Sequence, residues 1–452
     1  MNYEKFIESK KHTEYSCGFD TVYYPDEIFD FQKEIIKRAV SKGRVGIFAD
    51  TGLGKTRISI SIAQNIVLKT KGKVLICTPL AVAFQFILEA NTIGIDSIEY
   101  SRDGKHNSNI VICNYEMLNK FDSSDFECVI LDESSILKNF KGQIKQSITA
   151  FMKKVRYRFL LTATPSPNDF IELGTSSEAL GYMGYMDMLG KFFKNNQNSV
   201  DSSNRNIGEK YYLKPHAEDS FFQWVNSWSI MIRKPSDIGF SDDRYILPKL
   251  IKNTHIIEKG STIGEDGTHR LFVQEAKTMT QIRQEQKLTE QERCKKAVEL
   301  ARGKTSVYWC NTNNESAILK SLDNEAVEII GSQSVEKKEE ILLAFANGEI
   351  KRIITKAKIT GMGLNWQHCN HCVFFPTWSY EQYYQAIRRF YRFGQKRDVI
   401  VDIVASSGQT RVIEAIEQKA KKANELYNKL VSGISKDFEK VELREKIILP
   451  KF

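Results

Sequence analysis

A stretch in the first eighth of the chain combines glycines, a lysine and a threonine in an order that can hold a triphosphate. Ala49 to Thr56 reads Ala-Asp-Thr-Gly-Leu-Gly-Lys-Thr. Gly52 and Gly54 let backbone N–H groups close around phosphate oxygens at the positive end of a following helix. Lys55 would add a point charge, and the Thr56 hydroxyl would bind Mg²⁺. The stretch therefore predicts a site for a nucleoside triphosphate and Mg²⁺.

Two consecutive acids can supply the other half of such a site. Asp132 and Glu133 follow Cys128 to Leu131, an apolar run typical of a buried strand. Asp132 is expected to hold Mg²⁺, and Glu133 is expected to polarise the attacking water. Two acids at a strand end are by themselves a common surface turn. Behind a phosphate-binding loop at this spacing, they indicate hydrolysis of the triphosphate.

Residues near these two motifs are candidates for further nucleotide contacts. Thr51 lies within the phosphate-binding loop, and Gln32, ahead of it, could read an adenine edge through its amide. An alternative is that Gln32 is an ordinary surface residue of a helix from Phe29 to about Ser41. Thr162 to Pro165 end another apolar run, and their hydroxyls either sense the γ-phosphate or simply form a turn.

Apolar runs separated by helical segments must position these residues. The first five such runs are Val45–Phe48, Lys73–Thr78, Asn109–Cys113, Cys128–Leu131 and Tyr157–Leu161. This alternation predicts a doubly wound parallel sheet, which binds ligands at the carboxyl ends of its strands. The pattern resumes in Ser306–Asn311, Ala326–Gly331, Lys351–Lys356, His371–Pro376 and Val399–Val404. We expect these to form a second parallel sheet that has no phosphate-binding loop of its own.

The stretch between the two sheets has a different pattern. Phe221 to Ile232 is expected to be helical, with Trp224 and Trp228 spaced by four. These aromatic side chains could stack on bases, but a stripe at helical spacing is more often part of a core. The predicted fold class is therefore α/β with two lobes and a helical insertion. We expect the first lobe over residues 1–173, the insertion and linker over 174–292, and the second lobe over 293–452 with a C-terminal helix.

Two arginines of the second lobe could complete the triphosphate site. Arg389 and Arg392 are three residues apart, so on a helix they share a face. If the second sheet faces the first across a cleft, they can reach the γ-phosphate and neutralise transition-state charge. The alternative is a solvated basic helix. With the phosphate-binding loop present, the catalytic interpretation is favoured.

Bulk composition sets broad limits on class and partners. The 452 residues include 65 Lys and Arg against 56 Asp and Glu, and this modest surplus of +9 is compatible with a polyanionic partner. No apolar run reaches the length of a membrane span, and no signal-peptide core precedes the first lobe. The eight cysteines are scattered, which is typical of free buried thiols in a reducing compartment. We therefore expect a cytoplasmic protein that does not bind membranes.

One cluster of soft ligands invites a zinc interpretation. His368 to Cys372 holds two histidines and two cysteines, but they are too close in sequence to surround one tetrahedral ion. A second ligand pair at the usual spacing is missing, so a turn that begins a strand is favoured.

Taken together, the motifs resemble the ATPase core of superfamily 2 nucleic-acid motors, most closely the SNF2-type DNA translocases and their phage-encoded relatives. The stretches that carry the resemblance are Ala49–Thr56 (motif I), Thr78–Pro79 (Ia), Asn114–Glu116 (Ib), Asp132–Asn139 (the acid box), Leu161–Pro165 (III), Gly361–Asn365 (V) and Gln385–Gln395 (VI). Ile230–Lys234 and Leu247–Lys249 are similar to the segment that joins the helical protrusion to the second lobe. The resemblance spans roughly residues 29–430.

The resemblance implies two RecA-like lobes, ATP and Mg²⁺ as cofactors, and DNA as the partner. It implies that Gly363 contacts the nucleotide and that four residues contact DNA phosphates, namely Thr78, Pro79, Asn114 and Lys358. Binding would be largely independent of base sequence and sensitive to salt. A core without appended chromatin-reading domains suggests remodelling of forks and junctions in replication, recombination or repair. A bacterial or phage-infected cell is the expected setting, and the oligomeric state stays open, a monomer included.

The chain also departs from the family pattern. Ser134 and Ser135 replace Ala-His in the acid box, Tyr391 stands where the family has His, and Thr360 stands where it has Gly. Two alternatives to a DNA motor stay open at this point. One is an RNA-directed helicase, and the other is a non-catalytic clamp that binds nucleic acid through a decayed motor fold.

Overall fold

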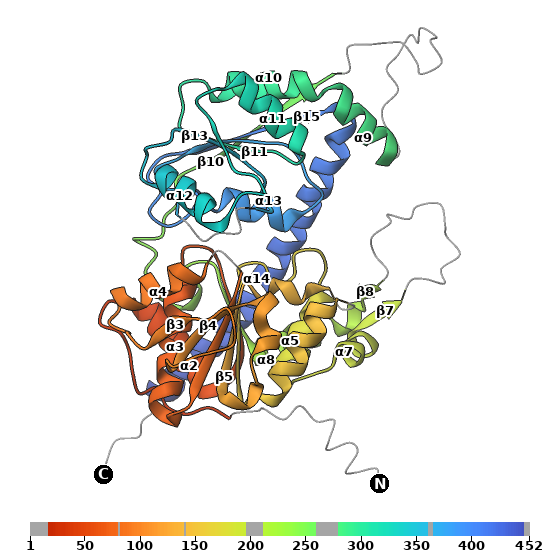
Figure 1. The fold of residues 1–452 in the computed structure, drawn as a ribbon. Coiled ribbons are helices and arrows are strands. Elements are labelled where there is room, and N and C mark those ends of the chain that lie inside the picture. Colours follow the sequence, from red (N-terminus) through yellow and green to blue (C-terminus); the bar gives the residue numbers. More distant parts are fainter. Residues whose placement is uncertain are drawn as a thin grey trace, which may run out of the picture. The chain divides into compact units, whose positions relative to one another are not determined.

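The computed structural model describes residues 17–79, 82–139, 142–195, 211–258, 279–359 and 365–446. The chain forms two compact units (Figure 1). The first contains Met1–Asp242 together with Ala423–Phe452, and the second contains Asp243–Lys422. These limits differ from the division expected at residues 173 and 292. The unit boundary at Asp242 falls inside the expected insertion, and the three-part division stays a prediction.

The first unit is built on a seven-stranded sheet in the order β3-β4-β2-β5-β6-β1-β9, with every pairing parallel. Its strands are β1 (Arg44–Ala49), β2 (Lys73–Thr78), β3 (Ile98–Tyr100), β4 (Ile110–Asn114), β5 (Phe126–Asp132), β6 (Tyr157–Leu161) and β9 (Ser229–Ile232). Strands β1, β2, β4, β5 and β6 are almost wholly buried, as the uninterrupted apolar runs predict. The doubly wound α/β fold is confirmed for this unit.

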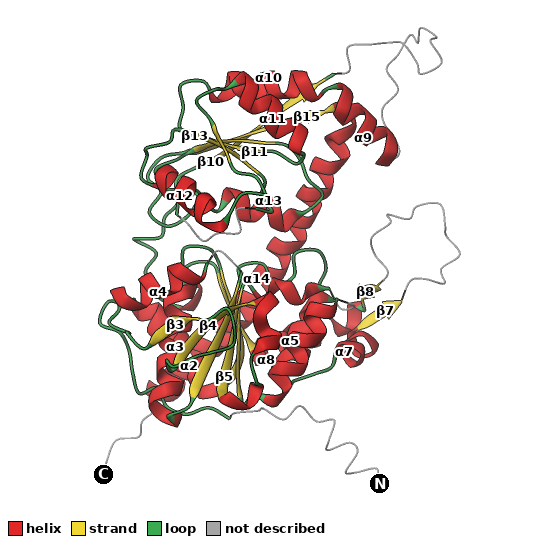
Figure 2. Cartoon of the chain, viewed as in Figure 1, coloured by secondary structure: helices red, strands yellow, loops and turns green. Residues whose placement is uncertain are grey.

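Helices surround this sheet (Figure 2). They are α2 (Asp30–Lys42), α3 (Lys55–Thr70), α4 (Ala83–Thr92), α5 (Gln143–Lys154), α6 (Glu172–Leu180), α7 (Tyr185–Phe192) and α8 (Glu218–Trp228). A separate antiparallel pair consists of β7 (Phe193–Asn195) and β8 (Tyr211–Leu213). Short 3₁₀ turns include η1 (Tyr115–Lys120), η3 (Ser134–Lys138) and η6 (Pro235–Ile238).

The expected helix over 221–232 is wrong in its last turn. Helix α8 ends at Trp228, and Ser229–Ile232 forms β9, which pairs with β1 in register Gly46↔Ser229. The apolar run is more stable as a buried strand of the sheet than as another helical turn, because it can pair with the free edge of β1. Trp228 is fully buried, with its ring edge-on to Phe48 at 5.9 Å. The tryptophans are therefore core residues rather than base-stacking ones.

The second unit contains a six-stranded parallel sheet in the order β10-β15-β14-β11-β13-β12. The strands are β10 (Leu250–Ile257), β11 (Ser306–Trp309), β12 (Val327–Glu328), β13 (Arg352–Thr355), β14 (His371–Phe374) and β15 (Val399–Ser406). The helices are α9 (Met279–Leu288), α10 (Glu290–Ala301), α11 (Asn313–Leu322), α12 (Val335–Ala346), α13 (Tyr380–Ile387) and α14 (Thr410–Lys446), and η7 covers Ser407–Gln409. The second parallel sheet is confirmed. Its edge strand β10 was not predicted, because polar residues interrupt it.

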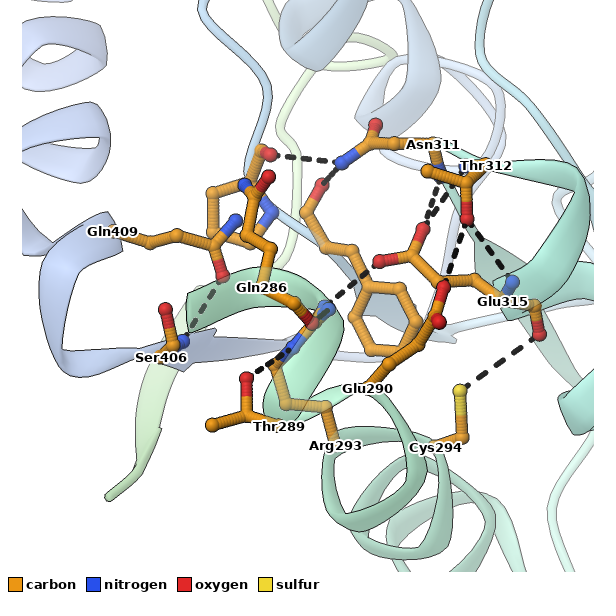
Figure 3. A network of polar contacts seen from close by, with 12 residues as sticks. Gln286, Thr289, Glu290, Arg293, Cys294, Asn311, Thr312, Glu315, Ser406 and Gln409 are labelled. Atoms are coloured by element: carbon orange, nitrogen blue, oxygen red, sulfur yellow. Dashed lines mark hydrogen bonds and ion pairs between the residues drawn. The ribbon is translucent and has the colours of Figure 1, made fainter. Parts of the chain in front are cut away.

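A buried ion pair joins two helices of the second unit (Figure 3). Arg293 of α10 is 1 % exposed, and its Nη1 donates to Glu315 Oε1 of α11 at 2.8 Å. Glu315 also accepts hydrogen bonds from the backbone N–H groups of Asn311 and Thr312, which lie between β11 and α11. The network therefore holds the carboxyl end of β11 against both helices.

The C-terminal helix α14 is longer than the predicted helix over 411–432, and its residues from Ala423 onward belong to the first unit. All eight cysteines are free, and seven of them are buried, as the sequence predicts. Within the described ranges, every helix falls short of the length and apolarity that a bilayer span requires.

Candidate nucleotide-binding site

The phosphate-binding loop leaves β1 and enters α3, as predicted. Gly52 has φ +87° and Gly54 has φ +78°, a left-handed conformation that favours glycine. A Cβ atom on Gly54 would lie 2.2 Å from Gln32 Nε2. The backbone angle therefore favours glycine at position 54, and a Cβ atom there would also displace the Gln32 amide.

Lys55 lies in the first turn of α3 and reaches back over the loop. Its Nζ donates to the backbone O atoms of Ala49 at 3.0 Å and Asp50 at 3.3 Å. The Thr51 backbone N–H donates to Asp50 Oδ1 at 2.6 Å, which closes the loop from within. Thr56 follows Lys55 and is half-buried. The loop thus places an ammonium group and a hydroxyl at the N-terminus of one helix, where anions bind.

Gln32 is not a surface residue, because its side chain is 2 % exposed. Its Nε2 donates to the Leu53 backbone O at 2.9 Å, and its Oε1 accepts from the Phe29 backbone N–H at 3.1 Å. The amide therefore ties the start of α2 to the phosphate-binding loop. Its predicted contact with adenine stays a prediction.

Asp132 ends β5 and is 6 % exposed. Burial raises the pKa of its carboxyl group to about 7, the neighbouring Glu133 adds to the rise, and the Lys55 ammonium opposes it. The Tyr115 hydroxyl donates to the Asp132 backbone O at 2.5 Å and fixes the strand end. No local pattern predicts this role for Tyr115, because its partner lies at the end of β5, 17 residues further along the chain. The predicted proximity of Lys55 and Asp132 is present in the fold.

Glu133 has an unusual backbone conformation for a residue with a side chain. Its φ of +53° and ψ of +52° lie in the left-handed region, and such strain is commonly kept at functional sites. The Thr162 hydroxyl donates to Glu133 Oε2 at 3.2 Å, and the Thr164 N–H donates to Thr162 Oγ1 at 3.1 Å. Thr162 is thus more than a turn former, since it orients the acid.

The donor set at this site fits Mg²⁺. Two adjacent carboxylates, one buried with a raised pKa, are stabilised by a cation. Among the described residues, no three His, Cys, Asp or Glu side chains gather in a way that would hold a metal by themselves. Asp132 and Thr56 would therefore hold Mg²⁺ together with phosphate and water oxygens, the coordination that this ion prefers.

The predicted DNA contacts divide into buried and accessible residues. Thr78 is fully buried at the end of β2. Asn114 is 1 % exposed, and its Nδ2 donates to Tyr100 Oη at 2.6 Å. Both side chains are buried at strand ends of the first sheet, and their contacts with DNA stay predictions. Pro79 is half-buried and Lys358 is exposed, and their roles stay predictions.

The two predicted arginines do not lie on a helix. Helix α13 ends at Ile387, and the Arg389 backbone O accepts from the Trp366 N–H at 3.0 Å instead of from a further helical turn. Phe390 is fully buried between them and anchors the turn. The helical-face argument for Arg389 and Arg392 is therefore wrong. Both belong to the second unit, and their contact with ATP stays a prediction.

Two other expectations concern the second unit. Gly363 lies outside the described residues, as does most of the stretch 361–365. In the suspected zinc cluster, the Cys369 thiol donates to the backbone O of Thr305 and of His371. The His371 ring contacts Ser306 Oγ at 2.7 Å and Asp402 Oδ2 at 2.8 Å. These side chains are used within the fold, in keeping with the preference for a turn over a zinc site.

Two helicase family models match the chain. The DEAD/DEAH box helicase model matches residues 29–172, and the helicase conserved C-terminal domain matches residues 286–394. The first match contains the whole phosphate-binding loop and both acids. The second contains Arg389 and Arg392, which supports their placement in a helicase-type second lobe.

Several curated proteins are similar over part of the chain. One is the Xenopus laevis SWI/SNF-related matrix-associated actin-dependent regulator of chromatin subfamily A-like protein 1, 28% identical over 164 residues, or 34% of this chain and 17% of the relative. Another is the DNA repair protein RAD5 of Yarrowia lipolytica, 30% identical over 126 residues, or 27% of this chain and 12% of the relative. The matched segments thus cover less than a fifth of these relatives.

Among solved structures, the Sulfolobus solfataricus SWI2/SNF2 ATPase core in complex with dsDNA aligns with 96% of this chain and 100% of its own chain. Its sequence identity is 18% and its TM-score is 0.42.

Proposed function

Because the chain is a superfamily 2 helicase-type ATPase with SNF2-like sequence, we propose that it hydrolyses ATP in order to move along DNA. The observation that carries this proposal is the arrangement around β1 and β5. Lys55 and Asp132 interact electrostatically at the strand ends, and Thr162 holds Glu133 beside them. Such a set serves phosphoryl transfer to water better than it serves binding alone.

Each residue has a distinct task in the proposed reaction. The Gly52–Gly54 loop and Lys55 hold the triphosphate oxygens. Glu133 polarises the attacking water, and Thr162 keeps its carboxylate in place. Mg²⁺, held by Thr56 and Asp132, would neutralise charge on the phosphates. We further propose that Arg389 and Arg392 stabilise transition-state charge when ATP is bound.

DNA is favoured as the partner by two kinds of observation. The relatives in the comparison are, by their names, a chromatin regulator and a DNA repair protein. The chain carries a net charge of +9, which suits a polyanion. We propose contacts with phosphates through surface groups such as Lys358, and action on duplex or branched DNA, including forks and junctions. A bacterial or phage-infected cell as the setting stays a proposal, which the two named eukaryotic relatives do not support.

Phosphate release, measured at matched salt, tests the proposal. The protein is assayed with no nucleic acid, single-stranded DNA, linear duplex, junction DNA or RNA. We expect duplex or junction DNA to stimulate release, and Lys55→Ala to abolish it while DNA binding is retained. Lys69→Ala is the matched control, because Lys69 is exposed near the other end of α3. Arg392→Ala should also abolish stimulation.

Other outcomes would overturn parts of this proposal. Stimulation by RNA alone would favour an RNA-directed helicase. DNA binding without hydrolysis under any condition would favour a non-catalytic clamp. Equal rates on linear duplex and on junctions would remove the preference for branched DNA.

A further inference from the structure

Helix α14 contacts the loop that orients Glu133. The Tyr427 hydroxyl donates to the Ala163 backbone O at 2.7 Å, across 264 residues of sequence. Tyr427 is 5 % exposed and Ala163 is 4 % exposed, so the bond is shielded from water. Ala163 directly follows Thr162, which donates to Glu133 Oε2. A side chain of α14 therefore hydrogen-bonds directly to the loop whose Thr162 contacts Glu133, the proposed water-polarising acid.

The same tyrosine also contacts the other side of the site. The Arg233 guanidinium lies 3.9 Å from the centre of the Tyr427 ring, and Arg233 Nη2 donates to Asn424 Oδ1 at 2.8 Å. Arg233 directly follows β9, and the Ile232 backbone O accepts from the Asp50 N–H at 2.9 Å. Tyr427 thus touches one segment that leads to Glu133 and one that leads to the phosphate-binding loop.

Other contacts hold α14 in place independently of this hydroxyl. Leu426 and Leu430 are almost fully buried. Lys429 forms an ion pair with Glu218 of α8, and its Nζ lies 5.1 Å from the centre of the Phe222 ring. Loss of the Tyr427 hydroxyl should therefore leave the helix docked, because these anchors remain.

We propose that Tyr427 is a positioning residue for ATP hydrolysis. Its hydroxyl restrains the loop after β6, so that Thr162 keeps the Glu133 carboxylate aimed before substrate arrives. Such restraint accelerates a reaction because groups that are already aligned need not reorganise on the way to the transition state. The kinetic part of this inference rests on the proposed ATPase function.

Tyr427→Phe removes the hydroxyl and keeps the ring against Arg233. We expect kcat for ATP hydrolysis to fall about fivefold at unchanged KM, the size of effect that one lost hydrogen bond can produce. Tyr182→Phe is the matched control. Its hydroxyl also donates to a backbone O at 2.7 Å, that of Arg44, which begins β1 at the end opposite the phosphate-binding loop.

Amide hydrogen exchange gives a second readout that needs no activity. In Tyr427→Phe, the Thr164 N–H should exchange several times faster than in Tyr182→Phe, because the loop is less restrained. Equal kcat in the two variants, or equal exchange at Thr164, would overturn the proposal. A wild-type protein that hydrolyses no ATP would overturn the proposed function instead, and the exchange comparison would still decide whether Tyr427 holds the loop.

Discussion

At the scale of single residues, the site depends on short polar contacts that hold otherwise unfavourable conformations. Glu133 has a left-handed backbone, and its carboxylate accepts a hydrogen bond from Thr162. Asp132 has a raised carboxyl pKa, and the Lys55 ammonium opposes the rise. Thr162 is the partner that matters most for the proposed chemistry, since its hydroxyl reaches the Glu133 carboxylate. In the acid box, Ser134 and Ser135 replace the usual Ala-His. The bond from Thr162 shows that the acid box and the loop after β6 are nevertheless connected.

Replacing Thr162 with Val removes that hydroxyl at nearly constant volume. Because hydrogen bonds to charged groups are worth about 1.5–3 kcal/mol, we expect kcat for ATP hydrolysis to fall at least about tenfold. Thr162→Ser keeps the hydroxyl and should retain most activity. Steady-state phosphate release in the presence of DNA measures both. Equal losses in the Val and Ser variants would show that the methyl group, rather than the hydroxyl, is what matters.

At the scale of elements, a buried polar cluster connects the strands of the second sheet. Asp402 of β15 accepts hydrogen bonds from Asn253 and contacts the rings of His255 and His371. Burial alone would raise its pKa, but these contacts hold the pKa of Asp402 below its ordinary value. Burial lowers the pKa of His371, Lys304 lowers it further, and Asp402 only partly opposes this. Protonation of His371 therefore affects the contacts that connect β10, β14 and β15.

This cluster predicts that stability falls in mild acid. The folded protein binds a proton at His371 less readily than the unfolded chain does, so acid favours unfolding. The loss begins as pH falls through the ordinary value of 6.5 and amounts to at most about 1.4 kcal/mol per pH unit. Thermal unfolding at pH 7.5 and 5.5 measures it. His371→Gln should flatten the dependence, whereas His216→Gln, at an exposed site of the first unit, should not.

At the scale of the whole molecule, two separate stretches of the chain form the first unit. The first unit takes its last segment, from Ala423 onward, from the end of the chain. The phosphate-binding loop, both acids and Tyr427 all belong to that unit. Nucleotide binding should therefore stabilise mainly the first unit, since a ligand stabilises the structure that holds most of its contacts.

A non-hydrolysable ATP analogue with Mg²⁺ should raise the unfolding temperature of one of two transitions. At a hundred times its Kd, the ligand adds about 2.7 kcal/mol, or a shift of about 5–10 °C for a unit of this size. Differential scanning calorimetry measures the shift, which Lys55→Ala should remove and Lys69→Ala should keep. An equal shift in both transitions would contradict the prediction that the nucleotide stabilises mainly the unit that contains the phosphate-binding loop.

The sequence alone determined the features that depend on neighbouring residues. The glycines and lysine of the phosphate-binding loop, the paired acids and ten strand-forming runs were readable because their signals depend on neighbouring residues. Those signals also gave two parallel sheets and a site at the strand ends of the first.

Tertiary structure decided what depends on distant partners. An open edge beside β1 turned the end of a predicted helix into β9. After α13, the Arg389 backbone O accepts from the distant Trp366 N–H instead of from a further helical turn. The bond from Tyr427 to Ala163 joins residues 264 positions apart, and no local pattern predicts such a bond. Packing therefore determined which side chains support the catalytic residues, since their partners become neighbours only on folding.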